Sequence, residues 1–349
     1  MRFPGIVFSI ATFFVMADSA IAARQHELDD CAGSDPDRSI AVYTRIPQGR
    51  GEPAKNDAIA CNNRGLAYRD KGELDRAVAD FNEAIRLDPE FALAYNNRGL
   101  AYRDKGEFDR AIADFNEAIR INPLPASTTH VNVFSNRGLA YRDKGDLDRA
   151  IADFNEAIRL DPKFAVAFNS RGFTYDRKGE RDRAIADYTE AIRLDPKFAV
   201  AFRNRGRAYL YAGALPKALA DFSQSSELDP KNGYAALWLE IIGKRSNLPS
   251  RLQQATEKID MTKWPAPVIH VFLGQLTPEA LLAAADNHDP KTKKGQVCEA
   301  NFYSGELALH QGTKDEATRL FKLAANDCPK GLIEWAAASA ELKALGVAP

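Results

Sequence analysis

One short motif is repeated almost without change along this chain. The sequence NNRGLAYRDKGE occupies residues 62–73 and again residues 96–107, and NRGLAYRDKGD follows at residues 136–146. Each copy contains an Arg-Gly pair, which recurs with glycines at Gly65, Gly99, Gly138, Gly172 and Gly206. The steps between these glycines are 34, 39, 34 and 34 residues. A fixed period of this length predicts a row of similar structural units, each packed against its neighbours.

Each unit has the pattern of two helices joined by a tight turn. Apolar residues recur at helical spacing in both halves of a unit, and Gly106 stands between the halves of the second unit, where the first helix must end. Small residues at Gly99 and Ala111 allow the two helices a close approach. The prolines that close the units are Pro89, Pro123, Pro162, Pro196 and Pro230. The five extra residues of the long step fall between Pro123 and Arg137, where the segment 124–129 predicts an enlarged loop.

The order of residue types within a unit resembles the tetratricopeptide repeat (TPR). In the second unit the matching residues are Tyr95, Gly99, Tyr102, Ala111, Phe115, Ala118 and Pro123. This resemblance implies an all-α fold, a right-handed α-solenoid of TPR helix hairpins with helical caps.

The repeat divides the chain into segments with different expected roles. We expect a signal peptide over 1–22, an N-terminal cap with a degenerate half repeat over 23–57, and five repeats over 58–230. The approximate repeat limits are 58–91, 92–125, 131–164, 165–198 and 199–232. A divergent helical region over 231–297, a sixth repeat over 298–331 and a capping helix over 332–349 complete the prediction.

An arginine and an aspartate recur at fixed places in every unit. If the first glycine is position 8, position 7 is Arg64, Arg98, Arg137, Arg171 or Arg205. Position 23 is Asp80, Asp114, Asp153, Asp187 or Asp221. The turn lies midway between these positions, so antiparallel helices bring the two side chains level. We therefore predict one Arg–Asp pair across each hairpin.

The N-terminal residues have the pattern of a secretory signal. Arg2 precedes an apolar run over 3–16, and Ala20-Ile21-Ala22 supplies small residues for cleavage after Ala22. The alternative is an uncleaved anchor. The sequence predicts a secreted or periplasmic, soluble protein with no membrane span after signal removal. Leu28-Asp29-Asp30 precedes Cys31 and does not match a lipid-attachment site, which speaks against outer-membrane anchoring.

Four cysteines are compatible with disulfides in an exported protein. Cys298 and Cys328 fall at positions 1 and 31 of the sixth repeat, at the open end of its hairpin, so we predict a bond between them, with reduced buried thiols as the alternative. A bond between Cys31 and Cys61 is left open, because the repeat spacing does not bring these residues together.

Charge and motif content give no sign of an enzyme or a nucleic-acid-binding protein. Lys+Arg is 47 and Asp+Glu is 48, which provides no electrostatic attraction for nucleic acid. The histidines lack metal-ligand spacing; they are His26, His130, His270, His288 and His310. We therefore expect no catalytic residues, no metal and no cofactor.

The predicted binding surface is the concave groove lined by the first helix of each hairpin. Positions 2, 5, 6, 9, 12 and 13 are expected to face it, and position 6 is mostly asparagine. One interpretation is that these amides bond the backbone of an extended peptide; the other is that they bond neighbouring helices. The candidate residues are Asn62, Asn63, Leu66, Arg69, Asn96, Asn97, Leu100, Arg103, Asn136, Leu139, Arg142, Phe173, Asn204 and Arg207.

Beyond Pro230 the repeat pattern weakens and then returns. We expect helices over 234–242 and 249–259, and an N-cap at Thr277 followed by Pro278. The sixth repeat carries Ser304 and Leu320 at positions 7 and 23, so it lacks both members of the Arg–Asp pair.

The C-terminal third also resembles a particular family. Trp264, Phe272-Leu273-Gly274 and Asn301-Phe302-Tyr303, together with the upstream repeats, are similar to the new-lipoprotein-I (NlpI) type of bacterial periplasmic adaptor. This resemblance implies an all-helical dimeric scaffold that brings a periplasmic protease to substrates such as peptidoglycan hydrolases. The sequence thus favours an exported adaptor that binds extended protein segments. The alternative is a structural assembly or oligomerisation element of the cell envelope without peptide cargo, and a homodimer is compatible with both.

Overall fold

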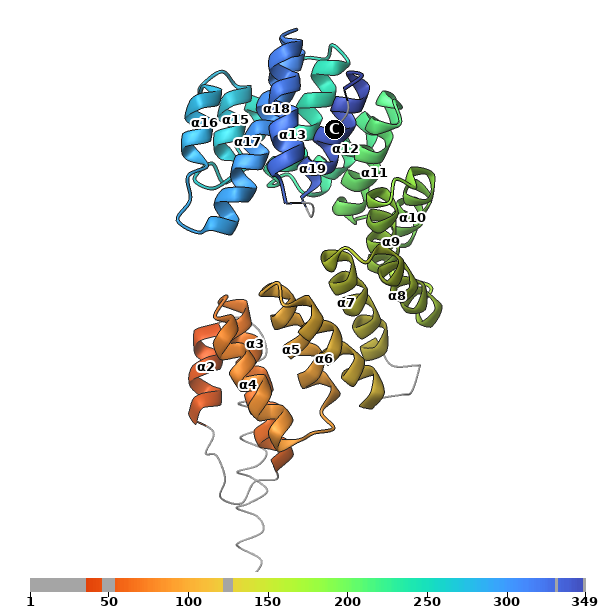
Figure 1. The fold of residues 1–349 in the computed structure, drawn as a ribbon, viewed down its shortest axis with the longest axis vertical. Helices are drawn as coiled ribbons and strands as arrows, with labels where there is room; N and C mark the ends of the chain where they lie inside the picture. Colours follow the sequence, from red (N-terminus) through yellow and green to blue (C-terminus); the bar gives the residue numbers. More distant parts are fainter. Residues whose placement is uncertain (1–35, 46–53, 122–127, 330–331, 348–349) are drawn as a thin grey trace, which may run out of the picture. The chain divides into compact units, whose positions relative to one another are not determined.

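The computed structural model describes residues 36–45, 54–121, 128–329 and 332–347, and regular structure within these ranges is helical (Figure 1). The chain divides into two compact units, unit 1 (Met1–Lys144) and unit 2 (Gly145–Pro349). Each unit is a series of helix hairpins, as the period predicts. In each hairpin the first helix is here termed the A helix and the second the B helix.

Unit 1 contains a short leading helix, two complete hairpins and the A helix of a third. The helices are α2 (Pro36–Arg45), α3 (Ala54–Asp70), α4 (Leu74–Leu87), α5 (Ala92–Asp104), α6 (Phe108–Ile121) and α7 (Thr128–Lys144). The A helices are α3, α5 and α7, and α5 contacts both of the others. The predicted half repeat corresponds to α2, which packs against α3.

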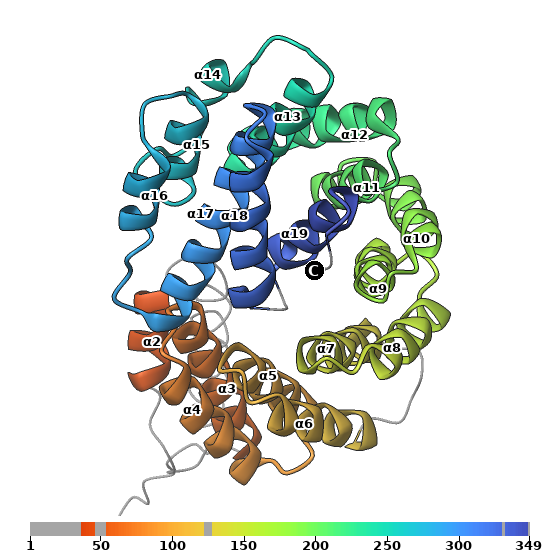
Figure 2. The same cartoon turned by 45° about the horizontal axis from the view of Figure 1, so that its top comes forward.

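Unit 2 begins with a B helix and continues through two full hairpins into the divergent region. Its repeat helices are α8 (Leu147–Leu160), α9 (Ala165–Arg177), α10 (Arg181–Leu194), α11 (Ala199–Tyr211) and α12 (Leu215–Leu228). The later helices are α13 (Gly233–Arg245), α14 (Leu252–Ala255), α15 (Ala266–Phe272), α16 (Pro278–Ala284), α17 (Pro290–His310), α18 (Lys314–Asp327) and α19 (Ile333–Ala344). The A and B helices of the last hairpin are α17 and α18, and α19 packs against both (Figure 2).

Two glycines shape the hairpin of α5 and α6: one forms the turn, and the other allows the two helices to pack closely. Gly106, between α5 and α6, has φ of 81°, a left-handed conformation that costs other residues energy. Gly99 serves a different purpose, because a Cβ built there would lie 2.8 Å from Cε1 of Phe115. The ring of Phe115 is fully buried, so the two helices approach each other through a glycine and an aromatic side chain.

The predicted Arg–Asp pairs are present in the hairpins that lie within one unit. Both guanidinium-to-carboxylate hydrogen bonds of each pair measure 2.6–2.8 Å. The pairs are Arg64–Asp80, Arg98–Asp114, Arg171–Asp187 and Arg205–Asp221. Such bidentate, half-buried contacts are stronger than ordinary surface ion pairs. The predicted partners Arg137 and Asp153 belong to different units, and their pairing stays a prediction.

The core of unit 2 joins aromatic residues of the repeats and of the divergent region. Trp238 stacks on Phe222 with ring centroids 5.9 Å apart, and its ring centroid lies 5.6 Å from that of Phe302. Cys298 and Cys328 form a disulfide, with Cα atoms 5.0 Å apart, as their repeat positions predict. This bond joins α17 to the end of α18.

Some of the helix limits predicted in the divergent region are confirmed, and others are wrong. The helix expected over 234–242 is present as α13, and Thr277 caps α16 by accepting a hydrogen bond from the amide of Ala280 at 3.3 Å. The helix expected over 249–259 is wrong in extent, because α14 has only 4 residues. Thr128 and Thr129, assigned to the enlarged loop, are the first residues of α7.

Several predictions concern residues that lie outside the described ranges. These are the signal peptide, the rest of the loop after Pro123, and Cys31. Cys61 is buried and makes no disulfide with another described residue. Among the described residues, no helix combines the length and the apolar character needed to cross a bilayer.

Candidate functional site

The A helices of unit 1 carry the same leucine, arginine and aspartate at three positions, whereas position 2 differs among Ile59, Leu93 and Asn132. We define the A-helix face as positions 2, 9, 12 and 13 of α3, α5 and α7. Its residues are Ile59, Leu66, Arg69, Asp70, Leu93, Leu100, Arg103, Asp104, Asn132, Leu139, Arg142 and Asp143. Positions 2 and 9 are two helical turns apart, so they lie on the same side of the helix.

Two large apolar side chains of this face are exposed. Ile59 and Leu93 each retain 42% of their accessible surface. Leu66, Leu100 and Leu139 follow two turns later and are half-buried. Sequence reasoning placed position 2 on the inner side of the helix but did not single out Ile59 or Leu93. Their exposure shows that the face has an apolar row as well as a polar one.

The polar row of the face connects successive repeats by ion pairs. Nε of Arg69 donates to Oδ2 of Asp104 at 2.7 Å, and Nε of Arg103 lies 3.8 Å from Oδ2 of Asp143. Arg142 bonds its own neighbour Asp143 at 2.8 Å. Burial lowers the pKa of Arg103, against the attraction of the two aspartates. The side chains remain 20–29% exposed, so they can also bond a ligand.

The predicted asparagines lie beneath this face and bond one another. Nδ2 of Asn97 donates to Oδ1 of Asn62 at 2.9 Å, and Nδ2 of Asn136 donates to Oδ1 of Asn96 at 3.0 Å. Asn63 donates to the hydroxyl of Tyr43 at 3.3 Å. The bonds of Asn97 and Asn136 run from position 6 of one unit to the preceding A helix, and the bond of Asn63 runs to α2. Of the two interpretations, these contacts favour bonding between neighbouring helices.

Burial limits what the asparagines can offer to a ligand. Asn62, Asn96 and Asn97 are 1%, 7% and 5% exposed, so an incoming peptide backbone would first have to displace their existing partners. Two adjacent amides on one helix also bond each other, as in Asn96 to Asn97 at 3.2 Å. We therefore infer that these amides position the A helices, as in the second of the two interpretations.

The candidate residues of unit 2 are in a different environment. Arg207 is only 4% exposed; its Nη2 lies 3.4 Å from Asp176, and its guanidinium is 5.5 Å from the ring centroid of Phe173. Asn204 is 4% exposed and donates to Asn169 at 3.0 Å. Arg207 and Asn204 therefore have little surface for a ligand within this unit, whereas Phe173 is half-buried.

A buried cluster of carboxylates lies farther along unit 2. Arg245 donates to Glu306 at 2.7 Å and to Glu341 at 2.9 Å. Glu299 accepts from Nε1 of Trp264 at 2.7 Å and from the hydroxyl of Tyr234 at 2.9 Å. These contacts tie α13, α17 and α19 into one core. Trp264, which carries the family resemblance, thus has a structural role here.

Burial shifts the titration of this cluster. It raises the pKa of Glu306 to about 7, against the attraction of Arg245. It also raises the pKa of Glu334, on α19, to about 7. Although burial opposes the charge on Arg245, the carboxylates of Glu306 and Glu341 raise the pKa of this arginine.

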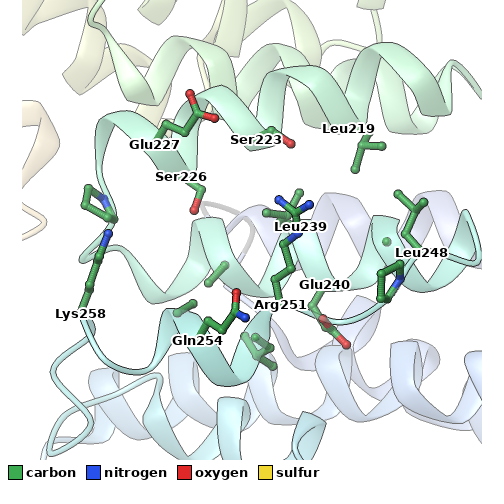
Figure 3. A pocket seen from close by; sticks show the side chains of 16 residues that line it. Leu219, Ser223, Ser226, Glu227, Leu239, Glu240, Leu248, Arg251, Gln254 and Lys258 are labelled. Atoms are coloured by element: carbon green, nitrogen blue, oxygen red, sulfur yellow. The ribbon is translucent and has the colours of Figure 1, made fainter.

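A groove that sequence reasoning missed lies between α12, α13 and α14. Its volume is about 560 Å³. Leu219 and Ser223 of α12 stand on one side, with Leu239 and Arg251 opposite them (Figure 3). The sequence signal that could have revealed it is Glu240, which occupies position 8, where the hairpins have glycine.

The repeat geometry agrees with comparisons to known families. A model described as a TPR repeat matches residues 65–103 and 138–179. Models described as tetratricopeptide repeats match residues 92–123 and 165–198. The chain contains tetratricopeptide repeats. The matched residues include the A-helix face of α5 and most of the corresponding residues on α3 and α7.

Several solved structures are similar to parts of this chain. The Cut9–Hcn1 hetero-tetramer of the APC/C superimposes with a TM-score of 0.52 at 18% identity, covering 66% of this chain and 44% of that one. YrrB, a TPR protein with an unusual peptide-binding site, has a TM-score of 0.40 at 26% identity, covering 52% and 91%. MamA has a TM-score of 0.41 at 28% identity, covering 48% and 95%. The similarity to Cut9–Hcn1 shows a shared helical-repeat fold.

Side chains that could hold a metal ion are scattered. Within the described ranges, histidine, cysteine, aspartate and glutamate do not gather in groups of three with metal-site geometry. The TPR fold is typical of scaffolds for protein–protein interaction, and the A-helix face and the groove are the two surfaces on which to look for partners.

Proposed function

We propose that this protein is a scaffold that binds an extended segment of a partner protein along the A-helix face of unit 1. The observation that carries the proposal is the composition of this face. It repeats a leucine and an ion-pair row on three successive A helices, with exposed apolar side chains at position 2 of the first two, and both rows keep exposed surface.

The contacts that close the hairpins do not involve the exposed side chains of Ile59 and Leu93, whereas Leu66 packs against the hairpin core. Each complete hairpin of unit 1 is closed by its Gly–aromatic contact and its Arg–Asp pair, as Gly99 with Phe115 and Arg98 with Asp114 illustrate. Ile59 and Leu93 leave 42% of their accessible surface open to a partner. A contiguous apolar row on a soluble protein commonly marks an interaction site, which supports binding as its role.

The two rows suit a segment of mixed character. Apolar side chains of the partner would be buried against Ile59, Leu66 and their equivalents, where most of the affinity arises. Its polar side chains would meet guanidinium and carboxylate groups in alternation. Because Arg69 and Asp104 already pair, a ligand gains specificity from them more than affinity.

The buried amides support this proposal indirectly. Asn97 and Asn136 each bond an asparagine of the preceding A helix, which fixes the spacing between successive helices. A surface held in its binding geometry loses less entropy when a ligand binds. The asparagines therefore act on binding through the position of the A helices.

We also propose that the scaffold works outside the cytoplasm as an adaptor. The N-terminal signal pattern supports export, and the Cys298–Cys328 bond suits an oxidising compartment. The residues similar to the new-lipoprotein-I type of adaptor support a periplasmic protease or a peptidoglycan hydrolase as the class of partner. A homodimer is compatible with this proposal, provided that a different protein also binds.

Affinity capture with charge-substituted variants tests this function. Ile59→Asp with Leu93→Asp places two carboxylates on the exposed apolar row, and Ala79→Asp with Ala113→Asp places them on exposed positions of the B helices. Protein recovered from an envelope extract should be lost with the first variant and kept with the second.

Two outcomes of this capture would contradict the proposal. Equal recovery by both variants would remove the A-helix face from the interaction. Recovery of only a second copy of this chain, with a change in mass by light scattering, would favour the alternative assembly role.

A further inference from the structure

The hairpin series of unit 2 contains an A helix without a full B helix. α13 follows α12 in the position of the next A helix and has 13 residues. The B helix α12 has 14 residues, but α14, which follows α13, has only 4. One side of α13 therefore lacks the cover that the B helix gives in the hairpins before it.

The sequence of α13 is adapted to this missing helix. Position 8 is Gly99 in α5, where it touches Phe115 of the B helix. In α13 position 8 is Glu240, which is 5% exposed and accepts a hydrogen bond from Oγ of Ser250 at 2.7 Å. Lys244 lies 3.4 Å from the same carboxyl group. A polar group thus takes the place at which an aromatic ring would pack.

The groove of about 560 Å³ lies where the missing B helix would stand. α13 lines it with Ala236, Leu239, Glu240 and Gly243, which are positions 4, 7, 8 and 11. Positions 7 and 8 of α5 are Arg98 and Gly99, and both contact its B helix. Leu239 and Glu240 are therefore equivalent to residues that contact a B helix elsewhere in the chain.

The walls of the groove have the length and the apolar surface for a helix. On α12 the lining runs from Leu219 to Glu227, which is about 12 Å at a rise of about 1.5 Å per residue. This is a little over two helical turns. Leu219 and Leu239 are half-buried, and Leu248 at one end is 44% exposed. Figure 3 shows the α12 side chains facing those of α13 and α14 across this space.

The two rims carry different charges. Arg251 and Lys258 are exposed on the α14 side, and Glu227 is exposed on the α12 side. None of the three forms an ion pair with another residue in the described part of the chain. An occupant with carboxylates along one flank and a cation along the other would therefore match both rims.

We propose that this groove binds an amphipathic α-helix of a partner protein, which completes the hairpin of α13 as a B helix. The helix would present leucine-sized side chains to Leu219 and Leu239. Its acidic flank would face Arg251 and Lys258. This mode is helix-in-groove recognition. The groove lies in unit 2 and shares no residue with the A-helix face, so this proposal is independent of the function proposed above.

Fluorescence polarisation with three synthetic peptides tests this proposal. All three share one composition: the first is an amphipathic helix with its carboxylates on the flank described, the second exchanges the acidic and basic flanks, and the third is scrambled. The full-length protein should bind the first peptide about tenfold more tightly than the second and should not bind the third.

Charge reversal provides the decisive comparison. Arg251→Glu with Lys258→Glu should reverse the preference, so that the flank-exchanged peptide binds more tightly. Lys314→Glu with Lys322→Glu changes the net charge equally on exposed positions of α18 and should leave the preference unchanged. Both variants should melt at the temperature of the parent protein, because the substituted side chains are exposed.

Three results would overturn the proposal. The first is that the parent protein binds none of the peptides or binds the scrambled one equally. The second is that the Arg251 and Lys258 variant keeps the original preference. The third is concentration-dependent self-association that this variant abolishes, since a second copy would then be the occupant. None of these results depends on the A-helix face of unit 1.

Discussion

Replacing Gly99 by alanine should destabilise unit 1, although alanine is the better helix former. Gly99 is in the interior of α5, where the substitution by itself would stabilise the helix by about 1 kcal/mol. The added Cβ would lie 2.8, 3.0 and 3.1 Å from three ring atoms of Phe115. Carbon atoms in favourable contact are about 3.5–4.0 Å apart, so the methyl group and the ring overlap.

The surroundings of Phe115 decide the size of this effect. The ring is fully buried, so it cannot move into solvent to make room. Overpacking of this kind costs about 1–3 kcal/mol, which exceeds the gain in helix propensity over most of that range. We expect Gly99→Ala to lower the free energy of unfolding by up to about 2 kcal/mol.

Denaturant unfolding followed by circular dichroism measures this change, and the chain offers a matched control. Gly243 is also helical, but a Cβ built there meets no atom within 4 Å. Gly243→Ala should therefore raise the free energy of unfolding by up to about 1 kcal/mol. Phe115→Leu combined with Gly99→Ala should lose less stability than the sum of the two single changes, because the smaller side chain relieves the overlap.

A stabilising effect of Gly99→Ala equal to that of Gly243→Ala would refute this reasoning. It would mean that the helices of the hairpin are not held at the distance that the glycine permits. Additive effects of Gly99→Ala and Phe115→Leu would lead to the same conclusion.

Three further predictions concern stability. The folded-state pKa of Glu334, about 7, is above the unfolded value of about 4.3, so the stabilisation from its protonation is complete below about pH 4.3 and is lost as pH rises through about 7. Glu334→Gln should reduce this loss of stability in thermal melts between pH 5 and pH 8. An unchanged dependence of the melting temperature on pH would contradict this prediction. The Cys298–Cys328 bond closes a sequence separation of 30. Replacing both cysteines by serine should lower the free energy of urea unfolding by about 3–4 kcal/mol. Equal unfolding midpoints with and without the bond would count against this prediction. Arg98→Met leaves the carboxylate of Asp114 unpaired at 9% side-chain exposure and should lower the free energy of unfolding by about 1–3 kcal/mol. Replacing both partners, Arg98→Leu with Asp114→Leu, removes the unpaired charge and should lower it less. An equal loss in the two variants would argue against the pair.

The repetitive part of the fold could be predicted from sequence because the same residue types recur at the same positions in successive units. The period located the turns, and the symmetry of Arg98 and Asp114 about Gly106 predicted their pairing. The same symmetry applied to Cys298 and Cys328. These are contacts within one hairpin, where sequence separation fixes which side chains are level.

Contacts between units were harder to predict from the same pattern. The sequence leaves Asn97 with two interpretations, a bond to a peptide or a bond to a neighbouring helix, and in the structure its amide bonds Asn62 of the preceding A helix at 2.9 Å. An amide has the same hydrogen-bonding groups for either partner. Which partner the amide bonds depends on the distance between consecutive A helices, and this distance cannot be derived from the spacing of residues along the chain.

The groove was missed because it arises from an element that is shorter than expected. The segment 249–259 contains enough apolar residues to suggest a helix, but α14 ends after 4 residues. Glu240 at position 8 was the available signal, since a carboxylate there cannot accept the usual aromatic contact. The buried carboxylates of α17 and α19 were missed for a related reason, because their partner Arg245 comes from a distant segment.

Site-specific photo-crosslinking tests the central claim most directly. A photoreactive residue at Leu93 lies on the exposed apolar row of the A-helix face, and one at Ala113 lies on an exposed position of the following B helix. The proposed function predicts that Leu93 crosslinks in cells to a distinct partner protein and that Ala113 does not. Crosslinking of the same partner with equal yield from Ala113, or no adduct from Leu93, would contradict the claim that this face binds a protein.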